Sequence, residues 1–101
     1  MTDAAGAQAT AQAFVESLDT WFSDPHDGPV VQWDATTELN FGWVFYWNSR
    51  LFLETGDGRH ALSGNTPFLV DRRDGSVRPL GTGHPLHQSI RAFADAWTTW
   101  G

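Results

Sequence analysis

Apolar side chains recur at helical spacing near both ends of the chain. Residues 7–22 are rich in alanine and glutamine, which favour helix, and a stretch with two prolines and a glycine follows at 23–29. Residues 85–97 open on a proline, which suits a first helical position. The two apolar stripes consist of Phe14, Leu18, Trp21 and Phe22, and of Leu86, Ile90, Phe93, Ala94 and Trp97. We therefore predict two amphipathic helices, each facing a core.

Strand spacing fills much of the interval between these helices. Residues 30–39 alternate apolar and polar side chains, with Val31, Trp33 and Ala35 on the apolar side, which predicts a half-buried strand. Residues 41–49 are apolar on both sides, which is typical of a central strand that is covered on both faces or that faces a partner. One face of this aromatic strand would carry Phe41, Trp43, Phe45 and Trp47.

Two local features refine this picture. Gly42, inside the aromatic strand, indicates a bulge or a close approach of two backbones. Residues 68–70 and 76–80 are strand-like and flank the turn sequence Arg73-Asp74-Gly75, which predicts a hairpin. Residues 50–65 read as a long connection whose apolar run would tuck under the sheet.

The order of elements predicts the fold class. Strands joined by hairpins pair antiparallel, and two helices with one apolar stripe each can cover a sheet. We expect an α+β fold, in which an antiparallel four-stranded sheet carries the N-terminal and the C-terminal helix on one face as a two-layer sandwich. The 101 residues suffice for a single domain over residues 1–101.

Composition and charge exclude several classes of function. The formal net charge of −6, from 6 basic and 12 acidic residues, argues against binding nucleic acid and suits a basic partner. The chain has no cysteine, so disulfides and thiolate metal sites are excluded and a reducing compartment is favoured. No apolar run reaches the roughly 18 residues of a membrane span, and no signal peptide is evident. We expect a cytoplasmic protein.

No constellation of catalytic residues stands out. His84 and His87 lie three residues apart, but a metal site would need at least one more ligand. Asp71 and Asp74 fall in a predicted turn, where carboxylates cap backbone groups. We predict no enzyme, no cofactor and no metal, and we keep open a small ligand-binding or catalytic pocket that would use Asp71, His84 and His87.

The aromatic strand is the strongest indication of function. Tryptophan and tyrosine are enriched in interface hot spots, although a chain that is 14% aromatic must place many rings in its core. We expect Trp43 or Trp47 to be buried by this chain alone, but not both faces of the strand. A large exposed patch there would mark a partner surface or a homodimer.

Five short motifs occur in order across residues 41–90. They are Gly42-Trp43-Val44-Phe45, Phe52-Leu53-Glu54-Thr55-Gly56, Leu62-Ser63-Gly64-Asn65-Thr66-Pro67, Val70-Asp71-Arg72 with Gly75, and Leu80-Gly81-Thr82 before Pro85. This ordered set resembles the YrhB-like domain, also called the immunity protein 35 family. The resemblance implies a small bacterial α+β protein that neutralises the cognate toxin of a polymorphic toxin system by binding it. It carries over no catalytic residue.

These observations combine into one functional hypothesis with two alternatives. We expect a non-enzymatic immunity protein whose aromatic strand anchors a toxin domain, while the 54–65 loop adds acidic steering and a polar contact. The expected contact residues are Trp43, Phe45, Trp47, Glu54, Asp57 and Asn65. The alternatives are a chaperone-like holdase, which the resemblance implies for one branch of the family, and a small ligand-binding domain.

Overall fold

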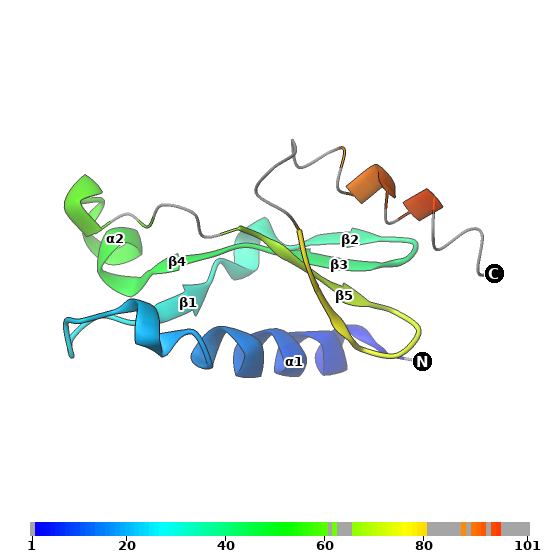
Figure 1. Cartoon of the computed structure of the whole chain (residues 1–101), viewed down its shortest axis with the longest axis horizontal. Helices are drawn as coiled ribbons and strands as arrows, with labels where there is room; N and C mark the ends of the chain where they lie inside the picture. The colour runs from blue at the N-terminus through cyan, green and yellow to red at the C-terminus, as the bar shows by residue number, and fades with distance from the viewer. Residues whose placement is uncertain are drawn as a thin grey trace.

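A computed structural model describes residues 2–60, 62, 66–80, 88, 90–92, 94 and 95. The described elements are two α-helices, three 3₁₀ turns and six short strands, arranged as Figure 1 shows. The α-helices are α1 (Ala4–Glu16) and α2 (Arg50–Thr55), and the 3₁₀ turns are η1 (Asp19–Trp21), η2 (Trp33–Ala35) and η3 (Gly58–His60). The strands are β1 (Pro29–Val31), β2 (Thr37–Leu39), β3 (Gly42–Phe45), β4 (Trp47–Ser49), β5 (Phe68–Asp71) and β6 (Val77–Pro79).

The strands pair antiparallel in a four-stranded sheet of order β2-β3-β5-β6 and a two-stranded ribbon of β1 and β4. Val44 pairs with Leu69 at the centre of the larger sheet, and Val31 pairs with Trp47 in the ribbon. The α+β class and the antiparallel four-stranded sheet are therefore confirmed.

Helix α1 covers one face of the sheet (Figure 1). Asp3 caps its first turn by accepting a hydrogen bond from the backbone N–H of Gly6 at 2.8 Å. Ala7, Ala11 and Val15 recur every four residues and are fully buried, so small side chains let the helix lie close to the strands. The α-helix ends at Glu16, and the rest of the predicted 7–22 helix is a turn that leads into η1.

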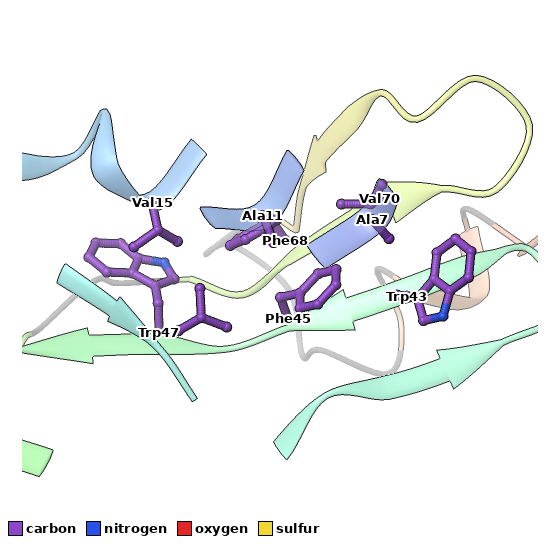
Figure 2. Packing of buried hydrophobic residues seen from close by; sticks show 9 residues of the cluster. Ala7, Ala11, Val15, Trp43, Phe45, Trp47, Phe68 and Val70 are labelled. Atoms are coloured by element: carbon purple, nitrogen blue, oxygen red, sulfur yellow. The ribbon is translucent and has the colours of Figure 1, made fainter. Parts of the chain in front are cut away.

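The main core lies between α1 and the strands (Figure 2). Phe45 stacks on Phe68 with ring centroids 5.6 Å apart, and Phe14 of α1 closes on Phe68 at 4.7 Å. The buried members of this core are Ala7, Ala11, Val15, Val31, Trp43, Phe45, Trp47, Phe68 and Val70. Aromatic rings from neighbouring strands thus supply most of its volume.

The opposite face of the sheet is covered as well. Val44, Leu69 and Leu80 are buried there. The partly buried residues packed against them are Leu39, Phe41, Tyr46 and Ile90. Our expectation that only one side of the aromatic strand is covered was wrong, because all four residues of β3 are buried.

The C-terminal helical segment lies on a different face of the sheet from the one predicted. Of the predicted 85–97 helix, the described residues 88, 90–92, 94 and 95 are helical, and the others lie outside the described residues. Ile90 packs on the face opposite α1, and Figure 1 shows these residues, in orange, across the sheet from α1. The two helical segments therefore do not share one face.

The two long predicted strands are each interrupted. Residues 30–39 break at η2, where the N–H of Ala35 bonds the carbonyl of Gln32 at 3.0 Å. This turn leaves Trp33 with 45% of its surface exposed, although alternation had placed it on a buried face. Residues 41–49 break at Tyr46, between β3 and β4.

The close backbone approach predicted at Gly42 is confirmed. A Cβ atom there would stand 2.2 Å from the carbonyl oxygen of Val70, and φ is +157°. Phe41, just before it, packs with the cluster on the face opposite Trp43.

The predicted hairpin between β5 and β6 is confirmed and is tied to its neighbours through Arg72. Gly75 adopts φ +73° in its turn. The Arg72 guanidinium donates to the carbonyl of Leu39 at 2.8 Å and lies 4.3 Å above the Trp43 ring. The Arg72 carbonyl accepts the Thr2 N–H at 2.8 Å, so one residue joins two hairpins and the start of the chain.

Candidate functional site

The predicted aromatic anchors are core residues in this structure. Trp43 and Trp47 are 4% exposed, and Phe45 is fully buried (Figure 2). Trp47 also donates its indole N–H to the carbonyl of Thr66 at 2.9 Å. Side chains buried in this way cannot insert into a partner without opening the fold, so these three residues are not protruding anchors.

Helix α2 is the exposed apolar feature that replaces them. Its sequence places Leu51, Phe52 and Leu53 in a row, and none of its residues is buried. Leu53 is 39% exposed, and Glu54 beside it is exposed. The expectation that this run tucks under the sheet was wrong, because the chain turns into a helix that projects at one end of the molecule (Figure 1).

A network of hydrogen bonds holds the start of α2. The fully buried Ser49 is its N-cap and accepts the backbone N–H of Phe52 at 3.1 Å. Its hydroxyl donates to the carboxylate of Asp27 at 2.7 Å. The same carboxylate accepts the backbone N–H groups of Gly28 and Leu51 at 2.7 and 3.2 Å. A segment 22 residues earlier in sequence therefore orients the helix.

This network also sets the ionisation of Asp27. Burial by itself would raise the pKa of Asp27, but the hydrogen bond from Ser49 and those from two backbone N–H groups hold that pKa below its ordinary value of 3.8. The carboxylate is therefore charged at neutral pH and acts as a fixed acceptor for the helix.

The end of α2 is equally defined. Gly56 adopts the left-handed conformation at φ +71°, and its N–H bonds the carbonyl of Phe52 at 2.8 Å. Asp57 then pairs with Arg59 at 2.6 Å, and the hydrogen bonds from Arg59 hold the pKa of Asp57 below its ordinary value. Of the two carboxylates predicted to steer a partner, Asp57 is thus neutralised within its own turn, while Glu54 remains exposed.

Charge is divided unevenly along the chain. Residues 1–49 contain seven acidic residues and neither lysine nor arginine, whereas residues 50–101 contain five acidic residues and six arginines. Residues 16–27 alone carry four of the acidic residues. We call residues 16–27 the acidic connection. It runs from the end of α1 to Asp27, whose carboxylate accepts the hydroxyl of Ser49, the N-cap of α2. Counting charge by segment would have revealed this surface from sequence.

The remaining predicted residues do not form a second site within the described residues. Asp71 is buried and accepts hydrogen bonds from the backbone N–H and guanidinium of Arg73 at 2.8 and 3.1 Å, so it stabilises the β5–β6 turn. Asn65, His84 and His87 lie outside the described residues. No group of three His, Asp or Glu side chains in the described ranges could hold a metal ion.

Comparison with known proteins identifies relatives. Over the described part of the chain, no helix is long and apolar enough to cross a membrane. No solved structure matches this chain. The chain is 40% identical over 82 residues to an uncharacterised protein, YrhB, of Escherichia coli (strain K12). The aligned region covers 79% of this chain and 84% of YrhB. The family model for immunity protein 35 matches residues 5–96, and the chain therefore belongs to the immunity protein 35 family.

Proposed function

We propose that this protein is a non-enzymatic immunity protein that neutralises a toxin domain by binding it directly through the α2 end of the molecule. Membership of the immunity protein 35 family supports a protein partner of this general kind. The observation that carries the proposed surface is α2 itself, an apolar helix with no buried residue that is nevertheless held at both ends by specific caps.

The energetics of α2 favour a binding role. A helix of six residues is too short to be stable alone, so its order depends on Ser49, Asp27 and the Gly56 cap. A rigid apolar projection loses little conformational freedom when a partner covers it. Leu53 supplies the exposed apolar surface, and Leu51 and Phe52 support it from half-buried positions.

The acidic connection supplies complementary charge. It adjoins α2 through the hydrogen bonds of Asp27, and it holds no lysine or arginine. Such a surface raises the rate of encounter with a basic partner. Residues 50–60, which comprise α2 and the turn after it, have no net charge, because Arg50 and Arg59 offset Glu54 and Asp57. Attraction would thus come from the connection and contact area from the helix.

Co-expression with a candidate toxin domain from a gene adjacent to this one tests the proposal. Growth should be rescued by the wild-type chain, and the two purified proteins should co-elute in gel filtration. Leu53→Gln should weaken the complex at least tenfold while leaving the thermal midpoint within a few degrees. Ala13→Gln, at an exposed position of α1, is the matched control and should bind normally. Absence of both rescue and complex would rule the proposal out.

The holdase alternative makes an opposite prediction. A holdase captures unrelated unfolded chains through broad apolar surface, whereas Trp33 and Leu53 are the exposed large hydrophobic residues among the side chains whose burial the structure describes. Suppression of aggregation of several unrelated clients at stoichiometric ratio would favour the holdase. Gel filtration of the chain alone would at the same time report whether it forms a homodimer.

A further inference from the structure

An apolar hollow lies beside α1 on the face of the sheet that the helix covers. It has a volume of about 180 Å³ and is partly open. Four elements (α1, β4, β5 and β6), the turn after α1 and the segment before β5 contribute to its wall, which is formed by Phe14, Leu18, Trp47, Thr66, Pro67, Phe68 and Pro79. All but one of these lining residues are apolar, so the hollow is suited to hydrocarbon.

The size of the hollow indicates what it can hold. Small-molecule and cofactor sites usually occupy roughly 300–1,000 Å³ and carry a few converging polar groups. This hollow is smaller, and the indole N–H of Trp47 in its wall is already bonded to the Thr66 carbonyl. A single large apolar side chain, of the kind that anchors protein interfaces in a pocket, fits these features better.

The charges around the hollow indicate which charged residues a partner would carry beside the inserted side chain. Leu18 in its wall lies inside the acidic connection, between the exposed Glu16 and Asp19. Neither carboxylate has an ion pair within the described residues. Arg78 precedes the lining residue Pro79, but strand alternation directs it to the other face of the sheet, where its guanidinium bonds Ser76. The rim on the α1 side is therefore acidic.

The hollow and α2 are close enough to serve one interface. Trp47 lines the hollow, and Ser49, two residues later on β4, caps α2. Two strand residues span only about 7 Å. A typical interface buries about 800 Å² on each partner, which is ample to include both features.

We propose that this hollow receives one large aliphatic or aromatic side chain of a basic protein partner, with lysine or arginine beside it facing the acidic connection. The inference rests on the proposed function and identifies a second, concave anchor for the same toxin domain. It differs from α2 in kind, because here the partner supplies the inserted side chain.

Two substitutions of one residue test the inference with the toxin domain that the wild-type chain neutralises in the co-expression experiment. Leu18→Phe adds volume in the hollow without adding polarity, and Leu18→Gln removes apolar wall. Both should lower the affinity measured by calorimetry at least tenfold. Leu18→Phe should leave the thermal midpoint unchanged or raise it, so that its lost affinity cannot come from a lost fold. Ala13→Gln serves as the control and should bind like wild type.

The possible failures are distinguishable. If the wild-type chain does not bind the toxin domain, the proposed function fails and this inference falls with it. If the wild type binds and Leu18→Phe binds equally well, the hollow is not an anchor, and the proposed function stands on α2 alone. A weakened Leu18→Phe complex together with normal binding by Ala13→Gln supports the inference.

Discussion

Replacing Ser49 with alanine should destabilise the protein through two specific losses. The hydroxyl caps α2 by accepting the Phe52 N–H, and loss of an N-cap costs about 1 kcal/mol. The same hydroxyl donates to the Asp27 carboxylate at 2.7 Å, and loss of a hydrogen bond to a charged group costs about 1.5 kcal/mol or more. Ser49 is fully buried, so water does not reach the site that its hydroxyl occupies. We expect Ser49→Ala to lower the free energy of unfolding by about 2.5 kcal/mol in total.

Urea denaturation followed by tryptophan fluorescence would measure this loss. For a chain of about 100 residues the midpoint should fall by about 1–2 M, and the thermal midpoint by about 10–20 °C. Ser17→Ala is the control, because the Ser17 hydroxyl bonds a backbone carbonyl at an exposed position, and it should change stability by less than about 0.5 kcal/mol. An equally small change in Ser49→Ala would refute the assignment of Ser49 as the residue that organises α2.

Three further predictions follow from individual contacts. The pKa of Asp27 is lowered on folding, so the stability that its carboxylate contributes is complete above the ordinary pKa of 3.8 and is lost as pH falls through the pKa of the folded state. Asp27→Asn should therefore flatten the fall in stability that urea denaturation measures between about pH 5 and pH 2. Gly42→Ala would place a Cβ atom 2.2 Å from a carbonyl oxygen of β5 and should prevent folding or lower the thermal midpoint by more than about 10 °C, while Gly58→Ala, with open space around it, should not. Arg72→Lys should cost about 1–2 kcal/mol in urea denaturation, because lysine cannot both cover the Trp43 ring and bond the carbonyl groups of Leu39 and Asn40; a variant as stable as wild type would contradict this role.

Local chemistry made some elements predictable. The β5–β6 hairpin was found because Gly75 permits the left-handed turn that its sequence requires. The close approach at Gly42 was found because glycine weakens a strand and commonly occurs inside one where two backbones come close together. Helix α2 could also have been found, since Ser49 and Gly56 are ordinary helix start and stop residues around an apolar run.

The other features depend on contacts between distant residues. Alternation alone cannot show that residues 30–39 turn at η2, so the exposure of Trp33 was missed. The bond between Asp27 and Ser49 spans 22 residues and leaves no local pattern. The burial of Trp43 and Trp47 depends on how closely α1 approaches, which is set by small residues in another segment.

The anchoring of Thr2 has a practical consequence for immobilising the protein. Its N–H bonds the Arg72 carbonyl at 2.8 Å, so the start of the chain lies against the β5–β6 hairpin. Figure 1 shows this point at the end of the molecule away from α2. A biotin or affinity tag attached at the N-terminus would therefore tether the protein with its α2 end directed away from the surface. The chain has six arginines and no lysine, so amine-reactive dyes and resins would find no lysine side chain on α2 or the acidic connection.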